Sequence, residues 1–360
     1  MSAAPGAESP VFIIGTERSG SNLLRLILDA HPRICVPHPP HFMRYLAGLA
    51  DSYGDLHVEA NRKQAVDDAL GLLRRHIHPW QHPIDPQRVL REAAPSVFGV
   101  VAAVYDQYRE AEGAARWGCK STFMVEHVEE VVAHYPKARF VWLVRDPCDV
   151  ASSAKRAVFG PSHPYRMALL WRAQQARAMA ALGGLGSSMV HLLRYEDLVS
   201  NPREEIERLC VFLGEKPEPA MLQHHRSSAA RRTAGLAEAW RNAALPVTPQ
   251  RIGAHRTGLT PHERLLVDKV TGPLKSHLGY PVEPGAQALP APSPVLVAVR
   301  SAALRTRVEY RSMRQDRNYR LRLGRDVYVR WLRVKARARH HYPWSTAGTR
   351  PSPASPRGAA

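Results

Sequence analysis

Residues 10–32 read PVFIIGTERSGSNLLRLILDAHP: an apolar run, a loop bounded by Gly15 and Gly20, and an apolar-periodic segment that stops at His31-Pro32. This order predicts a buried strand, a tight loop and a helix. Such a loop directs several backbone N–H groups and the positive end of a helix dipole at one point, which favours an anion. The structural alternative is a strand-to-helix turn that needs glycine only for its backbone angles.

The spacing from Gly15 to Gly20 matches the start of the phosphate loop G-x-x-x-x-G-K-[ST], but the chain continues with Ser21-Asn22. The lysine that spans the outer phosphates and the hydroxyl that binds magnesium are therefore missing. Arg18 is the only cation inside the loop. The loop predicts a phosphate site balanced by side chains and backbone, and we expect no metal.

Length and composition indicate a globular protein. The 360 residues, 44% of them hydrophobic, suffice for one large core or two modest domains. No stretch approaches the ~20 apolar residues of a membrane helix, and residues 1–10 show no secretory signal. The cysteines have no CxxC or zinc spacing, so we expect reduced thiols in a cytoplasmic enzyme; they are Cys35, Cys119, Cys148 and Cys210.

The formal net charge of +18 is unevenly distributed. Residues 300–341 contain 14 Lys or Arg against three acidic residues and contribute +11. The remainder is only modestly basic, which argues against a nucleic-acid binder as a whole.

The alternation of apolar runs and helical patterns predicts an α/β fold: a central parallel sheet of the P-loop NTPase type between two layers of helices. The expected strands are Val11–Ile14, Arg116–Cys119, Phe140–Val144 and Met189–Leu193. Polar loops follow them, and the carboxyl ends of parallel strands share one edge of a sheet. We therefore expect one crevice at that edge.

The helix over 202–213 is well marked, with Asn201 as its expected N-cap and Gly214 at its end. We expect the following organisation: a flexible N-terminus over 1–9, a domain over 10–280 with a helical insertion over 38–115 that caps the site, a linker over 281–294, a basic helical extension over 295–341 and a disordered tail over 342–360.

A second anion motif is ARFVWLVRDPCDVASS, residues 138–153, in which Arg145 emerges from a buried strand and Ser153 lies eight residues later. Arginine and a hydroxyl near a helix start suit a phosphate. A salt-bridged arginine in an Asp-Pro turn is the structural alternative for this motif alone.

The two motifs together resemble the sulfotransferase family, whose sulfuryl donor is 3′-phosphoadenosine 5′-phosphosulfate (PAPS). Two further segments, HLLRYEDLVSNPREEIERLCVFLG and RIGAHRTGLTPHERLLVDKVTGPLKSHLGY, look like the family's Tyr-Glu-Asp strand end and its closing loop with the last helix. The loop is similar to the bacterial branch that reads RSGS or RSGT, which also resembles tyrosylprotein sulfotransferases.

The resemblance implies roles for individual residues. Arg18 would neutralise charge on the bridging oxygen as phosphoadenosine phosphate (PAP) leaves, and Lys120 would lie near the sulfuryl group or the acceptor. The donor's 5′-phosphate would be bound by Ser19, Gly20, Ser21 and Asn22, and its 3′-phosphate by Arg145, Ser153, Arg251 and Gly253. Tyr195 would contact adenine, or fill the core instead; Lys120 could equally be a surface lysine.

The general base is not evident. Related sequences carry a Glu in a proline-rich stretch, but here the stretch is CVPHPPHFMRYL, and Pro39 occupies that place. His38 and His41 flank it, and histidine titrates near neutral pH. The sequence does not decide whether the general base is His38, His41 or a residue elsewhere.

The arginine-rich extension has three readings. A basic amphipathic segment can lie on an anionic membrane or bind a lipid-bearing substrate. It can also contact a partner or its own domain, and nucleic acid is the third and least expected reading. Its apolar residues form no single helical stripe, and Gly324 is expected to interrupt the run.

The sequence thus favours a PAPS-dependent sulfotransferase that acts on a hydroxyl of a carbohydrate, lipid-linked or secondary-metabolite acceptor. We expect it in the cytoplasm, either free or peripheral to the membrane. One alternative is an atypical P-loop nucleotide kinase, which would require magnesium. Another is a non-catalytic nucleotide-binding or anionic-surface-binding protein that keeps the fold. The acceptor and the oligomeric state stay open.

Overall fold

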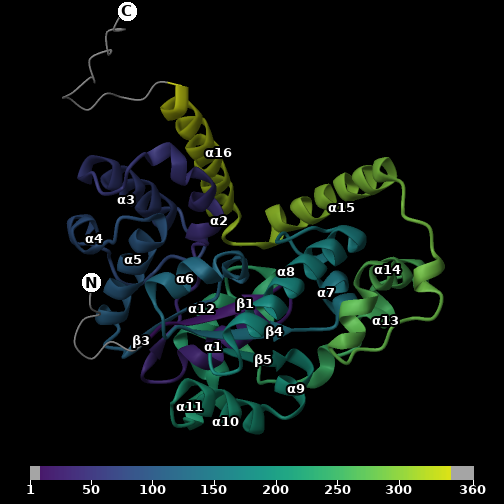
Figure 1. Ribbon diagram of the computed structural model, residues 1–360. Helices are drawn as coiled ribbons and strands as arrows, with labels where there is room; N and C mark the ends of the chain where they lie inside the picture. The colour runs from purple at the N-terminus through teal and green to yellow at the C-terminus, as the bar shows by residue number, and fades with distance from the viewer. Residues whose placement is uncertain (1–8, 342–360) are drawn as a thin grey trace, which may run out of the picture.

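A five-stranded parallel sheet forms the centre of the protein in the computed structural model, which describes residues 9–341 (Figure 1). The strand order is β2-β3-β1-β4-β5, and every neighbouring pair is parallel. The strands are β1 (Val11–Gly15), β2 (Ile34–Cys35), β3 (Arg116–Cys119), β4 (Arg139–Val144) and β5 (Val190–Arg194). The predicted α/β fold is confirmed.

The four predicted strands agree with the structure to within one residue at each end, but β2 was not predicted. This strand has only two residues, too few to show a period along the sequence. Its position at the sheet edge depends on pairing with β3, in which Ile34 lies opposite Arg116.

Alternating residues of the central strands face two separate cores, because successive side chains of a strand point to opposite faces. Val11 and Ile13 pack on one face, whereas Phe12 and Ile14 pack on the other. The first face is covered by α1 (Ser21–Asp29), α9 (Tyr195–Ser200), α10 (Pro202–Leu213) and α11 (Pro219–Leu222). The second is covered by α5 (Val97–Ala111), α6 (Val128–His134), α7 (Pro147–Ala154), α8 (Pro164–Leu185) and α14 (Pro261–His277).

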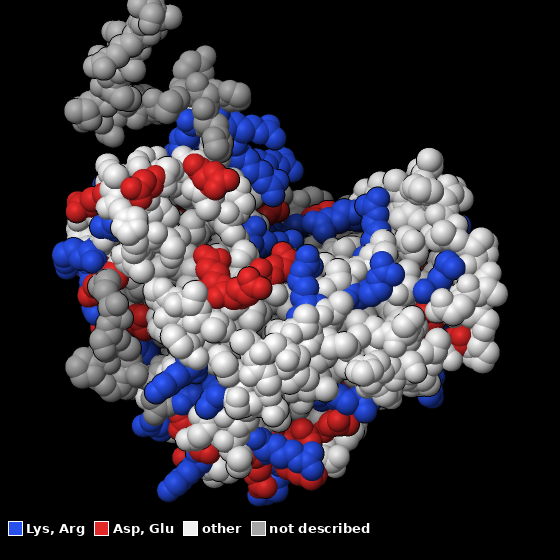
Figure 2. Space-filling model, viewed as in Figure 1, with Lys and Arg blue, Asp and Glu red and all other residues white. Residues whose placement is uncertain are grey.

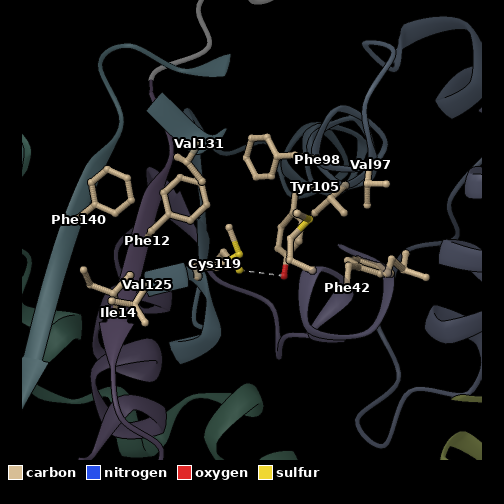
Figure 3. Close-up of a cluster of buried hydrophobic side chains, with 14 of the residues drawn as sticks. Phe12, Ile14, Phe42, Val97, Phe98, Tyr105, Cys119, Val125, Val131 and Phe140 are labelled. Atoms are coloured by element: carbon tan, nitrogen blue, oxygen red, sulfur yellow. Dashed lines mark hydrogen bonds between the residues drawn. The ribbon is translucent and has the colours of Figure 1, made fainter. Parts of the chain in front are cut away.

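The second core centres on Phe12, whose ring stacks on that of Phe140 with the ring centroids 5.5 Å apart (Figure 3). The ring of Phe12 also makes a T-shaped contact with Trp117, at a centroid distance of 5.4 Å. Tyr105 of α5 points toward Cys119, and its hydroxyl lies 3.5 Å from the thiol sulfur (Figure 3). These contacts fix α5 against the end of β3. All four cysteines are buried and unpaired.

The helix α10 begins and ends where the sequence predicts, and Gly214 closes it with φ 74°. Its buried face comprises Ile206, Leu209, Cys210 and Leu213, as expected. Asn201 occupies the N-cap position, but its side chain makes no capping hydrogen bond. The expected capping role of that side chain is therefore not realised.

Two groups of helices lie around the sheet edge that carries the site. Between β2 and β3 lie α2 (Phe42–Leu46), α3 (Glu59–Arg74), α4 (Pro86–Glu92) and α5. The second group comprises α12 (Ser228–Ala234) and α13 (His255–Gly258), which follow the last strand.

The basic segment forms two helices, α15 (Pro294–Gln315) and α16 (Tyr319–His341), and α16 lies beside α3 (Figure 1). The expectation that Gly324 interrupts the run is wrong, because this residue lies inside α16. Val308, Val329 and Leu332 are buried, so packing against the domain offsets the low helix propensity of glycine.

No helix within residues 9–341 is long and apolar enough to cross a membrane. The tail expected over 342–360 lies outside the described residues, as do residues 1–8.

Candidate active site

The loop between β1 and α1 has the backbone of an anion-binding turn. Gly15 and Gly20 have φ of 133° and 93°, and α1 begins at Ser21. A Cβ on Gly20 would lie 2.4 Å from the ring of Tyr195. Arg18 also has positive φ, 71°, a conformation that is costly for a side-chain-bearing residue and concentrates at functional sites.

The structure brings the two anion motifs together. Arg18 Nε donates to Ser153 Oγ at 3.2 Å, which joins the first loop to α7. Arg145 Nη1 lies 3.4 Å from the Arg18 carbonyl oxygen, and Arg145 Nη2 donates to the carbonyl of Arg251 at 2.6 Å. Arg145 therefore connects three of the predicted donor segments.

Asp149 ties the closing segment to α7. Its carboxylate accepts from the backbone N–H of Gly253 at 2.9 Å and of His255 at 2.8 Å, and lies 2.8 Å from His255 Nδ1. Burial opposes ionisation, but the hydrogen bond from His255 and the charge of Arg145 outweigh it and lower the pKa of Asp149. A charged carboxylate thus holds Gly253 in place.

Most of the predicted site residues line one cavity of about 770 Å³ at the carboxyl edge of the sheet. Those that line it are Arg18, Gly20, Ser21, Asn22, His38, His41, Lys120, Arg145, Ser153, Tyr195 and Arg251. Ser19 and Gly253 are not among the lining residues: Ser19 is buried within the loop, and the backbone N–H of Gly253 donates to Asp149. Tyr195 lies under Arg145, with the guanidinium carbon 4.2 Å from the ring centroid.

Several polar atoms around the loop have no hydrogen-bond partner in the described part of the chain. They are Ser19 Oγ, Ser152 Oγ and Arg145 Nε, and each is buried. Buried polar groups are normally paired, so an unpaired set of two hydroxyls and an arginine indicates a polar ligand. Their chemistry fits phosphate oxygens.

Burial disfavours the charged form of two side chains that line the cavity, Arg18 and Lys120. Burial lowers the pKa of Arg18 to about 10, against the opposing charge of Glu17. Burial, followed by the charge of Arg25, lowers the pKa of Lys120 to about 8. An anion beside these groups would restore their pKa values, because an opposite charge favours the ionised form.

The two candidate histidines differ in their surroundings. His38 is buried, with Nδ1 3.2 Å from His76 Nε2 and with Nε2 unpartnered. His41 has φ 57°, and its Nδ1 lies 2.9 Å from Ser121 Oγ. Burial, then the charge of Lys120, lowers the pKa of both histidines well below the ordinary value. Both are therefore neutral and weakly basic at neutral pH.

The cavity also contains residues that the sequence reasoning did not single out. Glu17 lies in the loop itself. Its Oε2 is buried and has no hydrogen-bond partner among residues 9–341, while Oε1 lies 3.8 Å from Arg44 Nη1. The sequence feature that could have identified Glu17 is its position beside Arg18 in GTERSGSN. The other additions are Arg44, Arg156, Trp240, Arg311 and Arg325, and the last two belong to the extension.

Within residues 9–341, no group of three or more His, Cys, Asp or Glu side chains is arranged to hold a metal ion. The parallel sheet, the glycine loop and the polar cavity at the strand ends define an α/β protein with a P-loop-like anion site. Residues 10–219 match the sulfotransferase family, and the chain belongs to this family.

Individual relatives agree with this membership. The chain is 25% identical over 227 residues to the "Putative protein-tyrosine sulfotransferase" of Caenorhabditis briggsae, a match covering 61% of this chain and 70% of the relative. It is 28% identical over 228 residues to the nodulation protein NoeE of Sinorhizobium fredii, covering 57% of this chain and 50% of the relative. The matched region thus spans half of the nodulation protein.

Solved structures show the same fold. The sulfotransferase domain of the Synechococcus PCC 7002 olefin synthase has a TM-score of 0.52 at 20% identity, covering 77% of this chain and 97% of that domain. The sulfotransferase domain of the curacin biosynthetic pathway has a TM-score of 0.51 at 21% identity, covering 78% and 100%. The chain is accordingly a sulfotransferase-family enzyme, and the family implies PAPS as donor.

Proposed function

We propose that the cavity binds PAPS at the loop end and transfers its sulfuryl group to a hydroxyl of a carbohydrate, lipid-linked or secondary-metabolite acceptor. The observation that carries the proposal is the junction of the two anion motifs, in which Arg18 bonds Ser153 and Arg145 contacts the first loop. A single phosphate loop would account for one bound phosphate. Two joined motifs fit a donor that carries one phosphate on the 3′ oxygen and another on the 5′ oxygen of its ribose.

In this proposal the donor's phosphosulfate lies against the loop over 15–22, where Ser19 Oγ is unpaired. The 3′-phosphate lies between Arg145, Ser153 and the closing segment at Arg251. Because Gly20 has no Cβ, the Tyr195 ring can lie beside the loop, where in this proposal it contacts the adenosine of the donor.

The donor supplies a sulfuryl group that passes to the acceptor oxygen, so one S–O bond forms as the S–O bond to the leaving phosphate breaks. Arg18 neutralises the charge that grows on the leaving oxygen, which is the main contribution a site makes to such displacements. Lys120, across the cavity, holds the transferred group or the acceptor by its positive charge.

The acceptor hydroxyl must lose a proton, and Glu17 is the carboxylate we propose for this step. Glu17 is next to Arg18 and has a buried, unpaired oxygen. Of the other two carboxylates that line the cavity, Asp149 accepts hydrogen bonds from Gly253 and His255, and the Glu238 side chain is 47% exposed to solvent, whereas that of Glu17 is 12% exposed. His38 and His41, the bases expected from sequence, are weakened because burial lowers their pKa values.

The outer face of the extension supports a second, separate proposal: contact with an anionic membrane surface. Val295, Leu296 and Val299 of α15 are 57–70% exposed, and α16 exposes Val327, Trp331 and Val334 among its arginines. Sedimentation with neutral and with anionic lipid vesicles tests this contact. Binding only to anionic vesicles, lost at high salt, is expected; equal binding to both kinds, or none, contradicts it.

Thermal unfolding without metal tests the main proposal. PAP, ADP and ATP with magnesium are compared, since a ligand at 100 times its Kd adds about 2.7 kcal/mol of stability. Stabilisation by PAP but not by ADP is expected, because the proposed site reads the 3′-phosphate. Stabilisation by magnesium-ATP alone would favour the nucleotide kinase instead.

The non-catalytic alternative makes a different prediction. It expects PAP to bind, but no sulfate to leave PAPS either to an acceptor or to water. Release of labelled sulfate from PAPS above the uncatalysed rate, abolished in Arg18→Ala, excludes this alternative.

A further inference from the structure

Two arginines of the C-terminal extension line the cavity of the catalytic domain. Arg311 of α15 and Arg325 of α16 lie on its wall, although both fall outside the family match over 10–219. Figure 2 shows Lys and Arg side chains gathered in the hollow between α16 and α15. The extension therefore adds positive charge to the cavity, and the residues that match the family do not form the whole of its wall.

The turn between the two helices is pinned to the domain. Asn318 donates its side-chain N–H to the Ile77 carbonyl at 3.2 Å, and Asp316 Oδ1 accepts from the Glu238 backbone N–H at 2.9 Å. Arg322, 3% exposed, pairs with Glu309 through two bonds of 2.9 and 2.5 Å and so joins α16 to α15.

The far end of α16 is held as well. Asp68 of α3 is 1% exposed and accepts from Lys335 at 2.7 Å and from Arg339 at 3.1 Å. Tyr53 donates its hydroxyl to the same carboxylate at 3.2 Å. With both ends anchored, the arginines that face the cavity have fixed positions.

Arg325 is 8% exposed, and its guanidinium carbon lies 5.9 Å from the ring centroid of Tyr45, which also lines the cavity. Its only ion-pair partner among the described residues is its neighbour Asp326, at 2.8 Å. Arg311 and Arg156 also line the cavity and have no ion-pair or side-chain hydrogen-bond partner within residues 9–341. Arg311 and Arg156 are therefore not neutralised by the described protein, and Arg325 is paired with Asp326 alone.

The donor does not balance the charge of the cavity either. Nine Lys or Arg and three Asp or Glu residues line it, a net charge of +6. PAPS carries about four negative charges at neutral pH, because its 3′-phosphate monoester contributes close to two. Positive charge is therefore left over, and Arg311 and Arg325 are not among the residues of the donor motifs.

We propose that Arg311 and Arg325 bind an anionic group of the acceptor, a phosphate, sulfate or carboxylate carried alongside the hydroxyl that is sulfated. This inference rests on the proposed sulfotransferase function and specifies its acceptor class. Arg156 supplements the subsite from α7's side of the cavity. Arginine suits this task because its planar fork binds such groups in bidentate fashion.

Calorimetric titration of the full-length protein, saturated with PAP, tests the subsite. The probes are inorganic phosphate and, in parallel, acetate, which distinguish a phosphate-type from a carboxylate-type group. The variants are R311Q alone and R311Q with R325Q. The matched control is R300Q with R330Q, which removes the same charge from exposed positions of the same two helices.

Wild-type protein with PAP is expected to bind at least one probe, and R311Q/R325Q to bind it at least tenfold more weakly. The control variant should change this affinity less than twofold. Unchanged affinity in R311Q/R325Q overturns the proposal, because the probe would then sit elsewhere, and so does failure of both probes to bind.

PAP affinity and Tm, measured on each variant, keep the result interpretable. If R311Q/R325Q does not fold, R311Q decides the matter, with an expected loss of at least threefold. Failure of wild-type protein to bind PAP would overturn the proposed function itself, whereas normal PAP binding without anion binding overturns only the acceptor subsite.

Discussion

Arg18 is the residue on which the two anion motifs converge. The loop holds it at φ 71°, and its guanidinium bonds Ser153 on α7, so its position depends on both segments. Strain of this kind persists only where the surroundings fix the residue. In the proposed function, Arg18 neutralises the charge that develops on the leaving phosphate of the donor.

Arg18→Ala should lower turnover about 10²- to 10³-fold, the loss typical of one charge-stabilising donor. Initial rates of sulfate release from PAPS measure this effect, with Arg203→Ala on the exposed face of α10 as the control. A loss below threefold would remove Arg18 from the proposed role.

Glu17→Gln tests the proposed proton acceptor. The amide keeps the shape of the side chain but accepts no proton, so kcat for an acceptor hydroxyl should fall about 10²- to 10⁴-fold while PAP affinity stays within threefold. His38→Gln and His41→Gln are the comparison variants. A larger loss in either of these than in Glu17→Gln would return the role to a histidine.

Lys120 should titrate far below an ordinary lysine. Burial lowers its pKa to about 8, so above that pH the free protein contains mostly the neutral amine at this position. Competitive acetylation from pH 6 to 11, read by peptide mass spectrometry, should give a midpoint near 8. Bound donor should shift this midpoint upward, because nearby negative charge favours the ammonium. A midpoint above 10 without ligand contradicts the burial seen here.

At the scale of elements, the strand–loop–helix unit depends on the absence of a side chain at residue 20. Gly20 has φ 93° and lies against the Tyr195 ring, whereas Gly113 has φ 68° with open space around its Cβ position. Positive φ disfavours alanine at both positions. Of these two glycines, only Gly20 also lies where a Cβ would meet a second element.

Gly20→Ala should therefore weaken PAP binding at least tenfold, because the loop or Tyr195 must shift. Gly113→Ala should lower Tm but leave the PAP Kd within twofold. Calorimetric titration of both variants separates the two effects. Equal PAP affinity in Gly20→Ala and wild type would show that the contact with Tyr195 plays no part in the donor site.

The packing of α15 and α16 on the domain could not be recognised from the pattern of apolar residues along the sequence. Their apolar residues form no single stripe, because α16, which lies beside α3, buries Val329 and Leu332 while Val327 and Trp331 are exposed. The docking is also polar, through Asp68. A segment that packs on several surfaces at once has no clean period to recognise.

On the scale of the whole molecule, the donor motifs and the extension occupy different parts of the chain. The donor residues fall between 15 and 253, and the extension begins at 294. The proposed donor site is therefore separable from the proposed acceptor subsite.

A chain ending at residue 290 should keep the PAP-induced rise in unfolding temperature while its own Tm falls. The fall follows from losing buried contacts of Val308, Val329 and Leu332, each worth about 1.5–3 kcal/mol when fully buried. Thermal unfolding with and without PAP measures both quantities. A truncated chain that folds but gains nothing from PAP would place part of the donor site in the extension.

The sequence by itself determined four of the five strands, the two anion motifs and the family, because each depends on local order along the chain, whereas β2 is defined by its pairing with β3. An apolar run before glycine, or arginine at a strand end, has the same consequence in any parallel sheet. Lys120 and Arg145 could be predicted for that reason.

Only the tertiary structure decided which side chains meet across the cavity. Glu17 is distinguished by an oxygen that has no hydrogen-bond partner in the described part of the chain, and the two histidines are distinguished by their burial. Arg311 and Arg325 line the cavity because the extension packs back on the domain. Burial and pairing are properties of contacts between distant segments. A linear pattern cannot contain them, because the same residues would be solvated if α15 and α16 packed elsewhere.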